Sequence, residues 1–107
     1  MRTQHDTAHQ LQSLTTLYQQ GYHSDVIDQT VHKLLTLEIA AAQQELTKLQ
    51  GRLQAFEHQY QMTSADFYQR FRTGAFGDSA EFVEWSVFYD MWLSIQKRLT
   101  TLQRSSN

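Results

Sequence analysis

An unbroken apolar repeat over residues 35–60 limits the folds open to this chain more than any other feature of its sequence. Successive apolar positions are separated by 4, 3, 4, 3, 4, 3 and 4 residues. This alternation is the a/d seam of a helix that packs lengthwise against another helix. The seam consists of Leu35, Ile39, Ala42, Leu46, Leu49, Leu53, Phe56 and Tyr60. We therefore expect one long helix with a helical partner.

The residues that end helices are scarce, which extends this expectation to the whole chain. The 107 residues include no proline and only four glycines. Few turns are available, so the chain must consist of a few long elements, and its composition favours helix. We expect one all-α domain over residues 1–107, with a variable N-terminal segment over 1–23 and an antiparallel, coiled-coil-like helical hairpin over 24–104.

Two helices are expected in the first half of the chain. Leucines at helical spacing predict a short helix over about 8–20 that ends at Gly21. Ser24 and Asp25 then form an N-cap and a negative first turn. The helix that they begin continues without a break to Gln61.

The second half of the chain predicts a hinge and a return helix. Met62-Thr63-Ser64 interrupts the long helix, and a short helix ending at Gly74 follows. Asp78-Ser-Ala-Glu81 resembles a capping box and begins a last helix that runs to about Arg104. The apolar stripe of this helix is Trp85, Phe88, Trp92, Ile95, Leu99 and Leu102.

Aromatic residues concentrate where the hinge and the return helix meet. Residues 67–92 hold nine of the thirteen aromatics. An antiparallel hairpin brings Phe56 and Tyr60 close to Phe82 and Trp85. We expect these rings to form the core at the hinge end.

A second apolar stripe lies on the first part of the long helix. Ile27, Val31 and Leu34, next to Leu35 and Ile39, leave this part apolar on two sides, so it must be covered on two sides. The helix is about 55 Å long at 1.5 Å per residue, and a shorter return helix cannot cover it. We expect these five residues to form a dimer or bundle face, with the chain a homodimeric four-helix bundle in isolation.

The sequence offers no convincing catalytic or metal site. Cysteine is absent, which excludes disulfides and thiolate ligands. His5 and His9 have the spacing of a helical ligand pair, but no carboxylate cluster accompanies them, and His32 suits a seam position that sets register. We expect no metal, no cofactor and no enzymatic activity.

An acidic group follows two arginines near the hinge. Arg70 and Arg72 precede Asp78, Glu81, Glu84 and Asp90. A carboxylate pair can do acid–base work, but no nucleophile motif or phosphate loop stands nearby. We expect helix capping by Asp78 and Glu81, with ion pairs to the arginines.

The charge and hydropathy of the chain limit the kinds of partner and the cellular location that we expect. The net charge is −2, the pI is about 6.2, and the nine Lys and Arg residues are scattered. Nucleic-acid binding needs a basic face, so we do not expect it. No apolar run reaches the roughly 20 residues of a membrane span, and the first ten residues lack the apolar core of a signal peptide. We expect a cytoplasmic protein that does not bind membranes.

A motif across the hinge resembles that of a known group. Tyr60-Gln-Met-Thr-Ser-Ala-Asp-Phe67 is followed by Gly77-Asp78 and by Phe82-Val-Glu-Trp85. This pattern resembles a group of small helical bacterial proteins, common in cyanobacteria, with a Tyr-x-Met-(Ser/Thr)-Ser-x-x-Phe hinge. The resemblance covers residues 24–102. It implies an uncharacterised, antitoxin-like protein encoded beside a small toxin.

These observations lead us to expect a non-enzymatic protein-binding module, antitoxin-like in covering a small toxin. The expected partner surface consists of Phe67, Phe71, Phe76, Asp78 and Glu84.

Two alternatives stay open. One is a structural or scaffold homodimer without a further partner. The other is a bundle that binds a small ligand among Phe76, Phe82, Trp85 and Tyr89, provided that an apolar cavity persists there.

Overall fold

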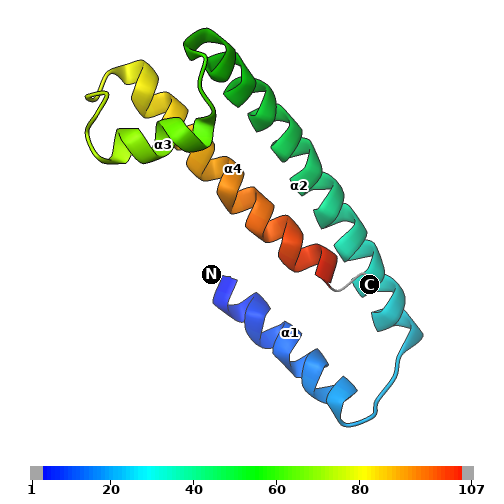
Figure 1. The fold of residues 1–107 in the computed structure, drawn as a ribbon. Helices are drawn as coiled ribbons and strands as arrows, with labels where there is room; N and C mark the ends of the chain where they lie inside the picture. Colours follow the sequence, from blue (N-terminus) through cyan, green and yellow to red (C-terminus); the bar gives the residue numbers. More distant parts are fainter. Residues whose placement is uncertain (1–3, 105–107) are drawn as a thin grey trace. The chain divides into compact units, whose positions relative to one another are not determined.

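The computed structural model describes residues 4–104 and is helical throughout, apart from the connections between helices (Figure 1). No strand occurs in this range, which confirms the all-α prediction. The helices are α1 (Gln4–Gln19), α2 (Asp25–Tyr60), α3 (Ser64–Arg72) and α4 (Ala80–Arg104).

The chain divides into two compact units, residues 1–34 and residues 35–107. The boundary falls inside α2 rather than at residue 23, where the variable segment was expected to end. Each unit is described by itself below.

The second unit is the expected helical hairpin. Within it, α2 and α4 lie side by side and run in opposite directions (Figure 1). Ala42 and Leu49 of α2 are buried against Ile95 of α4. Half-buried side chains of both seams complete this cluster, namely Leu46, Phe88, Trp92 and Leu99. The predicted pairing of the two seams is therefore confirmed.

A second cluster forms the core at the hinge end, where the sequence predicted an aromatic core. Leu53 of α2, Phe67 of α3 and Trp85 of α4 are buried together. The rings of Phe56 and Tyr60 stack on Trp85, with centroids 5.3 and 5.6 Å away. Three helices thus meet at one aromatic centre, which fixes α3 against the hairpin.

Three of the helix ends share one backbone pattern. At the ends of α1, α2 and α3, an amide N–H donates to the carbonyl five residues earlier: Tyr22 to Leu17, Met62 to Glu57, and Ala75 to Arg70. This bond belongs to the Schellman motif, which places one residue in the left-handed region. Glycine occupies that position twice, as predicted, with φ of 96° at Gly21 and 84° at Gly74. At the end of α2 the position is held by Gln61, with φ of 52°.

In the first unit, Tyr18 holds the connection between α1 and α2. Its hydroxyl accepts a hydrogen bond from the Ser24 backbone N–H at 3.1 Å. It lies 3.0 Å from the Ser24 carbonyl oxygen and 2.6 Å from Oδ1 of Asp28, both of which are acceptors. The Asp28 hydrogen bond, followed by partial burial, raises the pKa of Tyr18. The tyrosine therefore ties the end of α1 to the first turns of α2.

Candidate functional site

Phe67, one of the five residues expected to bind a partner, is buried in the aromatic cluster at the hinge. Phe67 and Trp85 are both completely buried, with parallel rings whose centroids are 3.8 Å apart. Nε1 of Trp85 donates to Oγ of Ser64 over 2.9 Å, so the indole is satisfied. The expectation that Phe67 contributes to an exposed partner surface is wrong, because its side chain is in the core.

The other four residues of the expected partner surface lie nearer to solvent. Phe71 and Phe76 are half-buried and stack on Phe67, with centroids 5.4 and 5.5 Å from its ring. Asp78, in the turn before α4, and Glu84, in the second turn of α4, are exposed. A partner role for these four residues stays a prediction.

The acidic group near the hinge is arranged differently from the expectation. Ser79 caps α4: its Oγ accepts from the N–H of Phe82 at 3.3 Å, and its carbonyl accepts from Val83 at 2.9 Å. Within residues 4–104, neither Arg70 nor Arg72 forms an ion pair with these carboxylates. Ser79, and not Asp78, accepts the hydrogen bonds at the start of α4, so the predicted capping by Asp78 and the predicted ion pairs are wrong.

Asp90 is held by a tyrosine instead. The hydroxyl of Tyr68 donates to Oδ1 of Asp90 over 2.6 Å, and this bond is the main reason why the pKa of Tyr68 is raised. The guanidinium of Arg72 lies over the Tyr68 ring, 5.7 Å from its centroid. The contact joins the outer face of α3 to α4.

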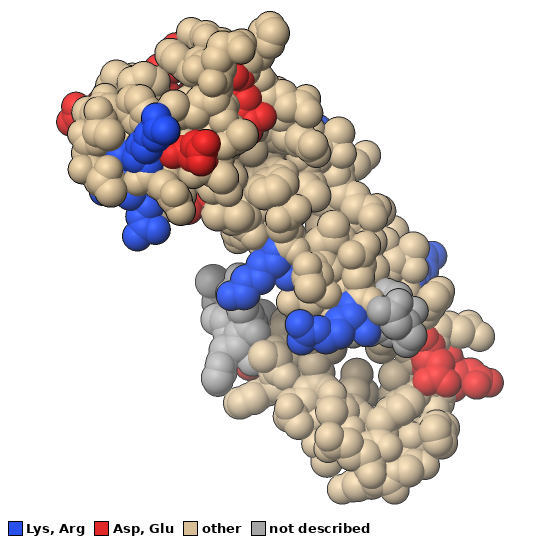
Figure 2. Space-filling model, viewed as in Figure 1, with Lys and Arg blue, Asp and Glu red and all other residues tan. Residues whose placement is uncertain are grey.

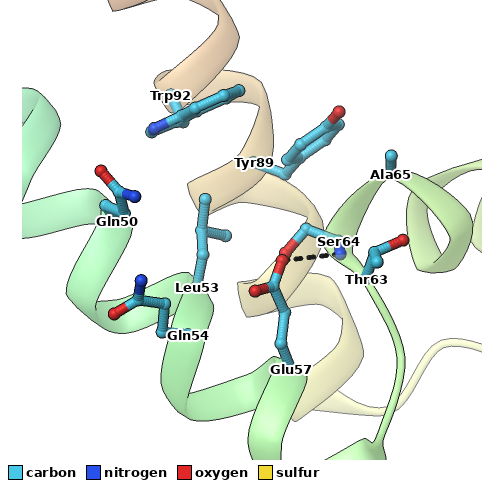
Figure 3. Close-up of a pocket in the computed structure, with 9 residues that line it drawn as sticks. All are labelled: Gln50, Leu53, Gln54, Glu57, Thr63, Ser64, Ala65, Tyr89 and Trp92. Atoms are coloured by element: carbon cyan, nitrogen blue, oxygen red, sulfur yellow. Dashed lines mark hydrogen bonds between the residues drawn. The ribbon is translucent and has the colours of Figure 1, made fainter.

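A pocket of about 230 Å³ lies beside the aromatic cluster, between α2, the start of α3 and α4 (Figure 3). Of the residues expected to line a ligand site, only Tyr89 borders it. Phe76, Phe82 and Trp85 instead pack against Phe67. The lining residues are Gln50, Leu53, Gln54, Glu57, Thr63, Ser64, Ala65, Tyr89 and Trp92.

One end of this pocket is the N-terminus of α3. The carboxylate of Glu57 accepts a hydrogen bond from the Ser64 backbone N–H over 2.8 Å (Figure 3). Oγ1 of Thr63, the N-cap residue, accepts from the N–H of Asp66 at 3.1 Å. An acidic side chain here is favourable, because the N-terminus of a helix carries partial positive charge.

The other end of the pocket is formed by Trp92. Nε1 of Trp92 is buried and has no hydrogen-bond partner among the residues that the structure describes. The nitrogen lies at the end of the indole that faces Gln50 and α2 (Figure 3). Tyr89 stacks almost parallel to Trp92, with centroids 5.9 Å apart and planes 14° apart.

The sequence did not predict that these residues line a pocket, for an identifiable reason. Leu53 and Trp92 were expected in the helix seams, and Gln50, Gln54 and Glu57 were assigned no role. Only the Thr63-Ser64 cap was visible, and a cap does not reveal which carboxylate from the preceding helix will reach it.

A second candidate site is the surface of the first unit. None of residues 6–34 is buried, although α1 and the start of α2 are rich in leucine and valine. Leu11 is 53% exposed and Val26 74%. The apolar surface consists of Leu11, Leu14, Leu17, Val26, Ile27, Val31 and Leu34, all exposed or half-buried.

The expected dimer face is divided between the two units. Val31 and Leu34 are 40% and 51% exposed in the first unit, where Ile27 is half-buried. Leu35 and Ile39 belong to the second unit and are half-buried. Use of this face for dimerisation stays a prediction.

Charged side chains, metal-ligating residue types and helix hydropathy do not indicate a further site among the described residues. On the face shown in Figure 2, the charged side chains are scattered among neutral ones. Among the side chains that the structure describes, no three of the types His, Cys, Asp or Glu gather as metal ligands would. His9 is included in that search, whereas the side chain of His5 lies outside the described residues. None of the described helices combines the length and hydropathy needed to cross a membrane.

Comparison of the chain with protein-family models, with curated proteins and with solved structures finds no match.

Proposed function

We propose that this chain is a non-enzymatic protein-binding module of the cytoplasm whose partner covers the apolar surface of residues 6–34. One observation supports this most: residues 6–34 include seven aliphatic residues of at least valine size, and none of the seven is buried. Single exposed apolar side chains are ordinary, whereas a segment in which every large aliphatic side chain stays at least partly uncovered favours an interaction site.

Burial of this surface would supply substantial free energy. Each valine or leucine side chain that moves from full exposure to full burial contributes about 1.5–3 kcal/mol. The residues here start partly covered, so each contributes less. A handful of them still suffices for a stable contact, since an amphipathic helix in an apolar groove binds through a few anchors at helical spacing.

The charged residues beside this surface indicate which charges surround the binding surface of the partner. Residues 6–34 contain three carboxylates, of Asp6, Asp25 and Asp28, and one lysine, Lys33, so their net charge is −2 with neutral histidines. A partner with an apolar centre and a rim of lysine and arginine would complement them. An antitoxin-like role, in which the partner is a small toxin, is the specific form of the proposal and accords with the hinge resemblance.

A scaffold homodimer is the second candidate. The stripe of Ile27, Val31 and Leu34 has the 4, 3 spacing of a helix seam and could pair with the same stripe of a second copy. The two candidates predict different masses: a homodimer needs no other chain.

The test compares two charge-matched variants. Leu11→Glu with Leu34→Glu places two carboxylates in the apolar surface, whereas Gln10→Glu with Gln29→Glu places two at exposed polar positions. Each tagged protein is purified from its native lysate, and the mass of the complex is measured by light scattering.

We expect the wild type and the glutamine control to retain one protein in fixed stoichiometry, and the leucine variant to lose it. Expressed alone, that protein should arrest growth, and co-expression of the wild type but not the leucine variant should relieve the arrest. A partner-free dimer that only the leucine variant disrupts would establish the scaffold instead. Equal behaviour of the two variants would refute both.

A further inference from the structure

The pocket beside Trp92 has the size of a small group rather than of a large ligand. Its volume of about 230 Å³ equals that of about eight waters, at about 30 Å³ each. Pockets for drug-sized molecules begin near 300 Å³. One amino-acid side chain or one small organic molecule would fill it.

The lining favours positive charge. Glu57 is the only lining residue that carries formal charge at neutral pH, and no cation pairs with it among the described residues. Its Oε2 accepts one hydrogen bond, from the Ser64 N–H, while a carboxylate can accept about four. The adjacent faces of Tyr89 and Trp92 also attract cations.

The lining also offers apolar contact. Leu53 lies between the carboxylate and the indole of Trp92, and its side chain forms an apolar floor (Figure 3). Nε1 of Trp92 is buried, so a ligand meets the ring of Trp92 and not this nitrogen. A suitable ligand therefore has a cation at one end and a methylene chain beside it.

We propose that the pocket binds an arginine or lysine side chain, with the guanidinium or ammonium group on Glu57 and the methylenes on Leu53, beside the rings of Tyr89 and Trp92. The same chemistry is present in a free basic amino acid and in a basic side chain of a protein. This site is independent of the proposed function, because it lies within residues 50–92 and the apolar surface lies within residues 6–34.

The indole N–H signals report on this site directly. The chain has two tryptophans, so an ¹H–¹⁵N spectrum shows two indole signals, and Trp92→Phe identifies the one from Trp92. The full-length protein is titrated with N-acetyl-L-arginine amide, which imitates an arginine within a protein, and with free L-arginine. N-acetyl-L-citrulline amide has nearly the same shape without the charge and is the matched neutral probe.

Two variants test the role of the carboxylate. Glu57→Gln removes the charge and keeps an oxygen that can accept from Ser64, so α3 remains capped. Glu81→Gln removes one exposed carboxylate outside the pocket. We expect a saturable shift of the Trp92 signal with an arginine probe, weakened about tenfold or more by Glu57→Gln, since a hydrogen bond to a charged group is lost, and unchanged in Glu81→Gln.

The two arginine probes distinguish the sources of the ligand. Tighter binding of the amide would assign the pocket to a basic side chain of a protein, and tighter binding of free arginine would assign it to the amino acid. The proposal is overturned if neither probe shifts the Trp92 signal saturably, if the citrulline probe binds as well, or if Glu57→Gln binds as tightly as the wild type.

Discussion

The rings of Phe67 and Trp85 lie 3.8 Å apart and 4° from parallel, and neither side chain is exposed to solvent. One belongs to α3 and the other to α4, so their stack fastens the hinge helix to the hairpin. Ser64, at the first position of α3, accepts the indole N–H of Trp85 and adds a buried polar contact to the same junction.

Trp85→Ala should lower the free energy of unfolding by about 3–5 kcal/mol, because it removes a large buried side chain. Ser64→Ala should lower it by about 1–3 kcal/mol, because the buried indole N–H then lacks its acceptor. Urea unfolding followed by circular dichroism measures both. Ser94→Ala, at an exposed position of α4, is the control, and an equal effect of Ser94→Ala and Ser64→Ala would contradict the role of the hydrogen bond.

Ala42→Leu should destabilise the protein although it adds apolar atoms. Ala42 is 1% exposed and packs in the cluster of Leu49 and Ile95, so a larger side chain forces the two helices apart, at a cost of about 1–3 kcal/mol. Ala41→Leu, one residue earlier and exposed, should change stability by less than about 0.5 kcal/mol. If thermal unfolding ranks the two variants the other way, the assignment of the α2 seam is wrong.

Gln61→Gly should stabilise the protein. Gln61 adopts φ of 52°, a conformation that glycine tolerates without the strain caused by a Cβ. The net gain should be at most about 1 kcal/mol, because relief of about 1–2 kcal/mol of left-handed strain is offset by the greater backbone entropy of glycine, about 0.5–1 kcal/mol, and by loss of the hydrogen bond from Nε2 of Gln61 to the His58 carbonyl. Gln61→Ala loses that bond and keeps the strain, so its urea midpoint should fall below that of the wild type. A glycine variant that is no more stable than the alanine variant would contradict this explanation.

Alkaline pH should weaken the contact between α3 and α4. The hydrogen bond to Asp90 raises the pKa of Tyr68 above its ordinary value of 10.0. A raised pKa in the folded state means that the stabilisation is complete below about pH 10 and disappears as the pH rises through the folded pKa.

Urea midpoints measured from neutral pH to about pH 11 should therefore fall more steeply for the wild type than for Tyr68→Phe. Tyr22→Phe is the control, because the Tyr22 hydroxyl makes no hydrogen bond to any of the described residues. Parallel curves for the wild type and Tyr68→Phe would show that the bond has no such linkage.

Removal of residues 1–23 should leave the hairpin folded. Every side chain that is buried in the described part of the chain lies between Ala42 and Ile95. We expect the shortened protein to keep a cooperative urea transition, with an unfolding free energy within about 1 kcal/mol of the full chain, since apart from the Tyr18 hydrogen bonds the removed residues are exposed and contribute little. Loss of cooperative unfolding would show that residues 1–23 support the hairpin.

Local features of the amino-acid sequence were sufficient to predict the helices and most of their ends. The 4, 3 spacing identified the seams of α2 and α4, because residues three and four apart share one face of any helix. Gly21 and Gly74 marked helix ends, because a left-handed backbone favours glycine. Where the end residue was not glycine, as at Gln61, the sequence indicated the break but not its geometry.

Packing between helices across the hinge determined which aromatic side chains are buried and where the pocket forms. Phe67 and Phe71 look equivalent in the sequence, one turn apart on the same face, yet Phe67 is completely buried and Phe71 only half-buried. Which ring meets Trp85 depends on how α3 crosses α4, and that contact spans 18 residues of sequence between Phe67 and Trp85. The pocket has the same origin: Glu57, Ser64 and Trp92 come from three helices. Helical periodicity acts over a few neighbouring residues, whereas burial and pockets arise where distant segments meet.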